Sequence, residues 1–317
     1  MTAAKIQHLN FIAAVFAMAL CLTFFAAGCG GEEDSGAGDA APAAGGSAGE
    51  PFEPGPFREA VFSRESAVGD DEAMIDVSRA AEGYFGVYSN SDTRLKLQVL
   101  KGDQTFTYDL TAGKTDFFPF QAGDGDYTVR VMKNLEAEKY FELCSATVSV
   151  TLNSEFEPFL HPGQYADYES GSQCVTLASS LAAEAADESG FIGAVYDYVS
   201  ANVKYDYDKA STVRSGYIPV PDETLATGKG ICFDYASLAA SMLRSQGVPT
   251  KIIFGYVAPD GLYHAWNMFY SENEGWVTAE FKTDPKNWNR LDLTFTANGA
   301  NGDFIGDGTN YTDVYQY

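Results

Sequence analysis

Two residues in the second half of the chain, Cys232 and His264, are of types that can perform nucleophilic chemistry together. Cys232 follows a Gly-Lys-Gly turn and opens an Ala/Leu-rich segment that predicts a helix from Ile231 to just before Gly247. A helix N-terminus presents unpaired N–H groups and a partial positive charge, which favour thiolate, the nucleophilic form of cysteine. The same N–H groups could stabilise an oxyanion on an attacked carbonyl. His264, in a strand-like segment, could accept the thiol proton and return it to a leaving amine.

The cysteine count also singles out Cys232. Of five cysteines, Cys21 and Cys29 fall in an N-terminal apolar segment, which leaves Cys144, Cys174 and Cys232. Unpaired thiols are a liability in an exported protein, and Cys144 and Cys174 can form a disulfide with each other. Cys232 is then the odd thiol and a candidate nucleophile. The alternative is that Cys232 is a small buried apolar residue, as free cysteines often are.

The histidines are equally few. His8 belongs to the N-terminal segment, so only His161 and His264 remain as imidazole partners. A lone histidine in an aromatic strand is more often structural, so His264 alone is weak evidence. The sequence contains no CxxC, HExxH or HxH spacing, and therefore predicts no metal site.

The first 28 residues predict a signal peptide. One lysine, Lys5, precedes an apolar run over residues 11–27, which is too short for a confident transmembrane helix. The run ends in Ala26-Ala27-Gly28-Cys29, which resembles a bacterial lipobox, in which the cysteine is lipidated and becomes the new N-terminus. A plain secretory signal cleaved nearby is the alternative, because Ala26 stands where leucine is usual. Residues 29–57 are rich in Gly, Ala, Ser, Pro and Glu and predict a flexible linker, so the folded part is expected outside the cytoplasm, anchored to a membrane.

The overall composition predicts globular cores and excludes one class of partner. Hydrophobic residues make up 45% of the 317 residues and aromatic residues 14%, which is enough for ordinary packed domains. Lysine and arginine number 20 against 44 acidic residues, a net charge of −24. A surface this acidic repels phosphate backbones, so no nucleic-acid partner is expected.

The two halves of the mature chain have different periodicities. Residues 58–157 contain segments of alternating apolar and polar residues near 95–99, 106–110, 127–131 and 148–152, separated by glycine-containing turns, which predict a small all-β sandwich. Residues 158–317 begin with helical patterns over 174–186 and 190–202, followed by the helix that Cys232 opens. Strand-like runs then cover 251–256, 263–270, 276–281 and 288–295. Helices followed by strands predict an α+β domain.

Several strings in this second half resemble the transglutaminase-like superfamily. They are Gly-Ile-Cys-Phe-Asp-Tyr-Ala at 230–236, Leu-Arg-Ser-Gln-Gly-Val-Pro-Thr-Lys at 243–251, His-Ala-Trp-Asn at 264–267 and the closing 288–295, together with Tyr-Asp-Tyr-Asp at 205–208. The resemblance covers roughly residues 187–295. Members of this superfamily use a papain-like Cys-His-Asp triad with the cysteine at a helix start. The resemblance therefore implies helices packed on an antiparallel sheet, with Cys232 as nucleophile and His264 as base.

The third triad member has two candidates. Trp276 and Trp288 each stand four residues before an acid, Glu280 and Asp292 respectively. Asp292 is the commoner residue type in the superfamily and has the matching sequence after it, although Leu293 replaces the usual proline. The resemblance therefore favours Asp292, with Glu280 as the alternative. Either carboxylate would hold the imidazole tautomer and stabilise the imidazolium.

The resemblance implies an exported thiol enzyme that acts on amide or peptide bonds through an acyl-thioester and needs no cofactor. Transfer of the acyl group to water, as in a peptidase or amidase, is favoured over transfer to an amine. The expected substrate is an extracellular protein or a cell-wall peptide. The alternative is a binding or scaffolding protein that keeps the fold without turnover; a third is an adhesin whose sandwich does the work. The presence of all three triad residue types favours the enzyme.

Overall fold

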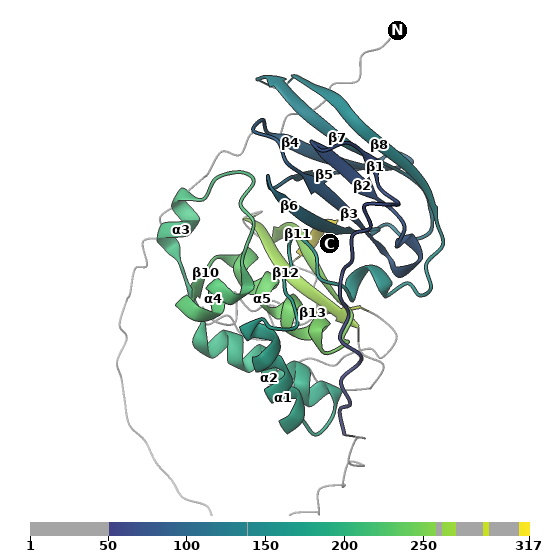
Figure 1. Cartoon of the computed structure of the whole chain (residues 1–317). Coiled ribbons are helices and arrows are strands. Elements are labelled where there is room, and N and C mark those ends of the chain that lie inside the picture. Colours follow the sequence, from purple (N-terminus) through teal and green to yellow (C-terminus); the bar gives the residue numbers. More distant parts are fainter. Residues whose placement is uncertain (1–50, 138, 258–261, 271–287, 292–310) are drawn as a thin grey trace, which may run out of the picture. The chain divides into compact units, whose positions relative to one another are not determined.

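The computed structural model describes residues 51–137, 139–257, 262–270, 288–291 and 311–317 (Figure 1). These residues belong to one compact unit that spans residues 50–317. The predicted division between residues 157 and 158 falls inside this unit.

Two four-stranded antiparallel sheets form the first half. One has the order β1 (Val68–Gly69), β2 (Ala73–Asp76), β3 (Tyr84–Ser89) and β6 (Lys114–Pro119). The other has the order β5 (Gln104–Asp109), β4 (Leu95–Lys101), β7 (Gly125–Glu136) and β8 (Lys139–Val150). Residues of both sheets share one apolar cluster, so the two sheets pack face to face and the predicted sandwich is confirmed.

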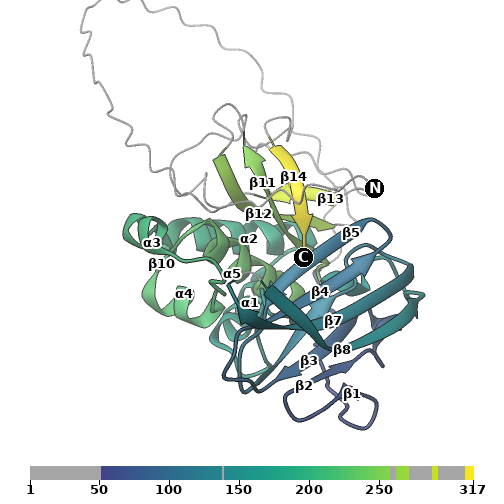
Figure 2. The same cartoon turned by 90° about the horizontal axis from the view of Figure 1, so that it is seen from above.

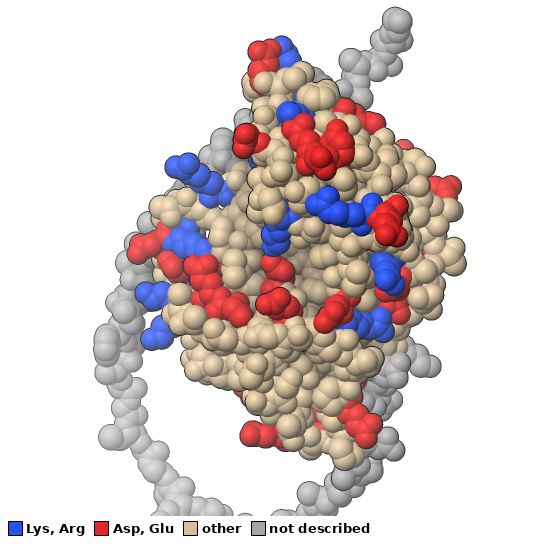
Figure 3. All heavy atoms as spheres, in the orientation of Figure 1, with Lys and Arg blue, Asp and Glu red and all other residues tan. Residues whose placement is uncertain are grey.

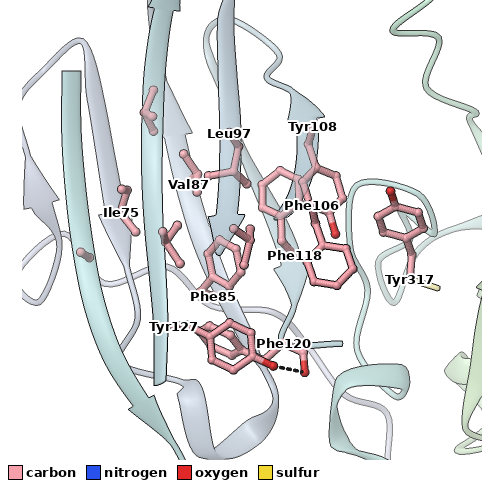
Figure 4. Packing of buried hydrophobic residues seen from close by; sticks show 14 of the residues in the cluster. Ile75, Phe85, Val87, Leu97, Phe106, Tyr108, Phe118, Phe120, Tyr127 and Tyr317 are labelled. Atoms are coloured by element: carbon pink, nitrogen blue, oxygen red, sulfur yellow. Dashed lines mark hydrogen bonds between the residues drawn. The ribbon is translucent and has the colours of Figure 1, made fainter. Parts of the chain in front are cut away.

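Alternation along each strand explains which face of the sandwich is buried. On β4, Leu95, Leu97 and Val99 are buried, and the residues between them are partly exposed. Because successive side chains point to opposite faces, every second residue reaches the space between the sheets. Figure 4 shows the aromatic part of this core, in which rings from β3, β5, β6 and β7 pack with the aliphatic side chains of β2, β3 and β4.

The second half begins with helices and ends with a sheet, as predicted. The helices are α1 (Gln173–Glu184), α2 (Glu188–Asn202), α3 (Tyr207–Thr212), α4 (Pro221–Thr227) and α5 (Cys232–Ser245), with a short parallel pair, β9 (Lys204–Tyr205) and β10 (Lys229–Gly230). An antiparallel sheet follows in the order β13 (Trp288–Leu291), β12 (Leu262–Tyr270), β11 (Thr250–Val257) and β14 (Tyr311–Gln316) (Figure 2). The predicted α+β class is therefore confirmed.

Helix α5 lies at the centre of this half. All of its residues from Asp234 to Ser245 are buried. One side contributes Leu238, Ala239 and Met242 to an apolar cluster with α1 and α2, and the other contributes Ala236 and Ala240 to the cluster shared with the sandwich. A helix that is covered on all sides is held rigidly, so its first turn is a fixed platform for side-chain chemistry.

Residues 51–60 form an extended segment, here called the strap, that packs against the helices. The Phe52 ring stacks on Phe191 of α2 with 4.7 Å between centroids, and the Gly55 N–H donates to the Gln246 carbonyl at 2.9 Å. Gly247, with φ of 90°, approaches Gly55 so closely that a Cβ on Gly247 would lie 2.9 Å from the Gly55 Cα. Residues 51–57, which the sequence placed in the linker, belong to the folded unit, and the rings of Phe52 and Phe57 are partly buried against the helices.

Aromatic rings and hydrogen bonds join the sandwich to the α+β half. Tyr317 lies with its ring centroid 5.1 Å from that of Tyr108 in β5 (Figure 4), and Gln316 Nε2 donates to the Gln121 carbonyl at 3.0 Å. Tyr165, in the connection between the halves, packs edge-on against Phe233 of α5 at 5.0 Å. Over the described ranges, no helix combines the length and apolarity needed to cross a membrane.

Candidate active site

Cys232 is the first residue of α5, as the sequence predicts, and it is partly exposed. The pairing of β9 with β10 fixes the chain just before it: the Lys204 N–H donates to the Gly228 carbonyl and the Asp206 N–H to the Gly230 carbonyl, both at 2.9 Å. Gly228 has φ of 60°, a left-handed conformation that ends α4 and turns the chain into β10. The thiol therefore sits at an anchored helix N-terminus, where the helix dipole favours an anion.

Asp234 holds this helix start and was not singled out from the sequence. Its side chain is fully buried, and Oδ2 accepts the Ile231 N–H at 2.7 Å and lies 2.8 Å from Lys209 Nζ. Oδ1 accepts the Tyr217 hydroxyl at 2.6 Å. Asp234 stands three residues after Ile231, the residue that precedes the helix, and an acid at this spacing is a known capping pattern. This spacing is the signal by which the sequence could have identified Asp234. Gly230 is required here, since a Cβ on it would lie 2.5 Å from the Asp234 Cβ.

Two tyrosines lie within electrostatic range of the Cys232 thiol. Tyr205 and Tyr263 both interact electrostatically with it. Burial, reinforced by neighbouring phenols and by Cys232, raises the pKa of Tyr263 to about 12, and burial raises the pKa of Tyr205 as well. Both phenols consequently keep their protons at neutral pH and can donate hydrogen bonds to an anion beside the thiol. The Tyr-Asp-Tyr-Asp motif at 205–208 singled out the segment that contains Tyr205, but the sequence indicated no role for this tyrosine.

His264 lies on β12, the strand that packs against α5. Asn267 Nδ2 donates to the Ala236 carbonyl at 2.9 Å, and Ala265 packs in the same cluster as Ala236, so Ala265 and Asn267 face the helix. Because side chains alternate along a strand, His264 shares the other face with Trp266. Both are buried, and their rings stack with centroids 6.2 Å apart.

Helix α5 and strand β12 run in the same direction. Asn267 lies beside Ala236 near the helix start, whereas at the helix end Arg244 Nε donates to the Thr250 carbonyl at 2.8 Å, and Thr250 pairs with Phe269. Cys232 and His264 therefore lie toward the same end of two adjacent elements. The alternation of β12 nevertheless turns the His264 side chain to the face opposite to α5, so the structure does not bring it together with Cys232, and their contact in a triad stays a prediction. Glu280, Asp292 and the lipidation candidate Cys29 lie outside the described residues.

The structure does not bring Cys144 and Cys174 together. Both are free thiols, and they belong to different apolar clusters: Cys144 packs in the sandwich, where its Sγ is 3.6 Å from the Ala73 carbonyl, and Cys174 packs among the helices. Burial raises the pKa of Cys144 to about 11, and burial together with Asp222 raises that of Cys174. The predicted disulfide is corrected on this point, since Cys174 is a buried core residue among the helices and Cys144 is a partly buried residue of the sandwich. No cluster of metal-ligating side chains occurs among the described residues.

Comparison with known protein families identifies this part of the chain. The model of the transglutaminase-like superfamily matches residues 175–281, a range that contains Cys232, His264 and Glu280 and ends before Asp292. Residues 175–281 are therefore similar to the transglutaminase-like superfamily, and we refer to them as the transglutaminase-like region. The resemblance noted in the sequence is thereby confirmed. The matched range covers most of α1, all of α2 to α5 and strands β9 to β12, whereas β13 and β14 follow it.

Two curated proteins are similar to parts of this chain. UPF0252 protein MJ1282 of Methanocaldococcus jannaschii is 36% identical over 67 residues, which are 20% of this chain and 19% of that protein. Protein ML0607 of Mycobacterium leprae is 30% identical over 125 residues, 36% of this chain and 39% of that protein. The chain thus covers well under two thirds of either relative.

The solved structures that match parts of the chain share little sequence with it. A candidate cysteine protease from Cytophaga hutchinsonii is 16% identical, with 74% of this chain and 83% of that chain covered and a TM-score of 0.40. LapG of Legionella pneumophila is 18% identical, with 45% and 70% covered and a TM-score of 0.33. Red sea bream transglutaminase is 13% identical, with 67% and 48% covered and a TM-score of 0.28.

Proposed function

We propose that this protein is a thiol enzyme that cleaves or transfers acyl groups at amide bonds, with Cys232 as the nucleophile. The observation that carries the proposal is the position of Cys232: a partly exposed thiol on the first residue of a buried, capped helix within a transglutaminase-like region. A fixed helix N-terminus both favours the thiolate and offers N–H groups to a developing oxyanion.

The proposed reaction begins when the Cys232 thiolate adds to a carboxamide or peptide carbonyl. The tetrahedral adduct expels the amine, which takes a proton from the His264 imidazolium, and an acyl-thioester remains on Cys232. Water, or an amine, then attacks the thioester and releases the thiol. Tyr205 and Tyr263, whose raised pKa keeps them protonated, lie close enough to Cys232 to interact with charge there and could donate to the oxyanion.

The carboxylate that orients His264 is proposed to be Asp292, with Glu280 as the alternative. The residues that follow Asp292 favour it, whereas the range matched by the superfamily model includes Glu280 and stops before Asp292. Comparison of Glu280→Gln with Asp292→Asn separates the two, because only the orienting carboxylate controls the imidazole tautomer.

The proposed setting is the outer face of a bacterial membrane, with the chain anchored through a lipid on Cys29 and acting on an extracellular protein or cell-wall peptide. Hydrolysis is proposed over amine transfer, and the chemistry requires no cofactor. The signal-like residues 1–28 and the −24 net charge of the chain support an exported, soluble catalytic part without a nucleic-acid partner. A catalytically silent surface binder with the same fold is the second candidate function.

The pH dependence of Cys232 alkylation tests the proposal. Full-length protein is treated with iodoacetamide between pH 5.5 and 9, and the peptide containing Cys232 is followed by mass spectrometry, with buried Cys174 as the internal slow thiol. Alkylation of an activated thiolate should slow by less than about threefold from pH 8 to pH 6, whereas a thiol with an ordinary pKa near 8.5 slows by nearly a hundredfold.

The matched variants assign the roles. His264→Gln should restore the ordinary pH profile, and either Asp292→Asn or Glu280→Gln should shift it in part. If wild-type Cys232 reacts with an ordinary profile that His264→Gln leaves unchanged, the enzymatic proposal is wrong, and the surface-binder proposal becomes the one to pursue.

A further inference from the structure

A second site lies away from Cys232, in a groove of about 340 Å³ between the strap, β6 and the connection from the sandwich to α1. Figure 3 shows the corresponding face hollowed, with acidic and basic side chains gathered around the hollow. Neither Cys232 nor His264 lines the groove. Its volume is within the range of sites that hold one amino-acid side chain or a small ligand.

The floor of the groove presents two buried acceptors. Asp116 and Gln164 line it, and each is less than 5% exposed. Asp116 Oδ2 accepts the Thr111 N–H at 3.2 Å and Gln164 Nε2 at 3.1 Å, which fixes both side chains. Gln164 Oε1 has no hydrogen-bond donor within the described part of the chain, and Asp116 Oδ1 has no hydrogen bond there and faces only the Lys114 ammonium, at 3.5 Å. Buried acceptors without donors are costly, so a ligand that supplies N–H groups here gains binding energy.

The rim of the groove is acidic. Glu59 on the strap and Asp167 and Glu169 on the connection are exposed, and Lys114 is the only basic residue among those that line the groove. Lys114 Nζ lies 2.7 Å from Asp167 and 3.5 Å from Asp116 Oδ1. Four carboxylates against one ammonium leave a net negative site, which favours a cationic ligand.

The walls of the groove are flat and apolar. Phe57 on the strap, Phe117 on β6, and Pro162 and Tyr168 on the connection supply them. Aromatic faces attract planar cations and cover the aliphatic stem of a long side chain.

We propose that this groove binds an arginine side chain of a polypeptide partner. A guanidinium group is planar, always charged, and carries five N–H donors in a rigid fork, so it can serve Asp116 Oδ1 and Gln164 Oε1 while it lies against an aromatic ring. A lysine ammonium is a point charge and matches two separated acceptors and a flat wall less well. The net charge of −24 on the whole chain attracts basic polypeptides to the surface in the first place.

The test compares two peptides that differ only in charge. Binding of Ac-Ala-Arg-Ala-NH2 and of Ac-Ala-citrulline-Ala-NH2 to the full chain is measured by titration calorimetry in 50 mM and 500 mM NaCl. The arginine peptide should bind at least tenfold more tightly than the citrulline peptide at low salt, and the difference should shrink at high salt. Free guanidinium chloride at the same concentrations distinguishes capture of the bare ion from recognition within a peptide.

The variants locate the site. Asp167→Asn should weaken arginine-peptide binding about tenfold, and Lys114→Met should strengthen it, because loss of the ammonium frees two carboxylates. Glu65→Gln, at an exposed acid outside the groove, is the matched control and should change nothing. Equal binding of the two peptides overturns the proposal, and so does an effect of Glu65→Gln as large as that of Asp167→Asn. Unchanged Cys232 alkylation in each variant shows that the fold and the first site are intact.

Discussion

The buried carboxylate of Asp234 should be a principal support of the helix that carries Cys232. Replacement of Asp234 by alanine removes the acceptor of the Ile231 N–H at 2.7 Å and separates Lys209 from its partner at 2.8 Å. It also leaves the Tyr217 hydroxyl without its acceptor at 2.6 Å. All three contacts are made at the first turn of α5, so their loss acts directly on the position of the thiol.

The expected loss of stability follows from these contacts. Removal of one partner of a buried ion pair costs roughly 3–5 kcal/mol, and loss of a helix N-terminal acceptor roughly 1 kcal/mol. The Lys209 side chain is 29% exposed and can turn toward water when Asp234 is absent, which reduces the first contribution. We therefore expect Asp234→Ala to lower the free energy of unfolding by about 3 kcal/mol. Asp234→Asn keeps an oxygen for the Ile231 N–H and should lose about half as much.

Urea unfolding followed by near-ultraviolet circular dichroism measures these changes. Asp208→Ala, at an exposed acid in α3, is the matched control and should stay within about 0.5 kcal/mol of wild type. A double-mutant cycle with Lys209→Met isolates the ion pair and should give a coupling of about 1–2 kcal/mol. An Asp234→Ala protein as stable as the Asp208→Ala control would refute the assignment of Asp234 as the support of this helix.

The remaining predictions concern pH and thiols. His161 is buried between Arg58 and Glu157, and burial and the nearby guanidinium lower its pKa below 6.5, so the unfolded chain binds a proton here that the folded chain does not. The free energy of unfolding should therefore fall as pH drops below 6.5 and level off below the folded-state pKa. Measured at pH 7 and pH 5.5, this fall should be smaller in His161→Gln than in wild type. An equal fall in the two proteins contradicts the reasoning. Cys144 and Cys174, both free, should alkylate fully in denaturant without any reductant, and a disulfide-linked peptide in the mass spectrum would count against the structure.

The long, periodic elements could be predicted from the sequence. The structure has α1, α2 and α5 within about two residues of the predicted ranges, because each has an apolar stripe, and Gly247 marks the end of α5. Short elements could not be predicted in this way. Helices α3 and α4 have only six and seven residues, and no residue of α3 is buried, so no apolar stripe marks it. They depend instead on local signals, the Asp206 side chain that accepts the Lys209 N–H and Pro221 at the start of α4.

The candidate site likewise combines features that the local sequence predicts with features that it does not. The helix-start position of Cys232 follows from local sequence, and the superfamily motifs identified His264. The roles of Asp234 and the tyrosines, and the groove with Asp116, depend on which distant segments meet. Asp116 contacts Gln164 from 48 residues away, a separation that no local pattern encodes. The disulfide predicted from the number of cysteines is wrong for the same reason. Cys144 and Cys174 pack in separate clusters, and the number of cysteines carries no information on the distance between them.

The docking of the strap has a consequence for the order in which the chain can fold. The strap is made first during synthesis, yet its partners Phe191 and Gln246 lie more than 130 residues later. Contacts of such separation form late, since a long loop must close before they contribute. During synthesis the Phe52 ring therefore has no packing partner until α2 and α5 are complete. The sandwich can therefore assemble early. The strap, which is made before the rest of the folded unit, adds its contacts to the helices only after α2 and α5 have formed.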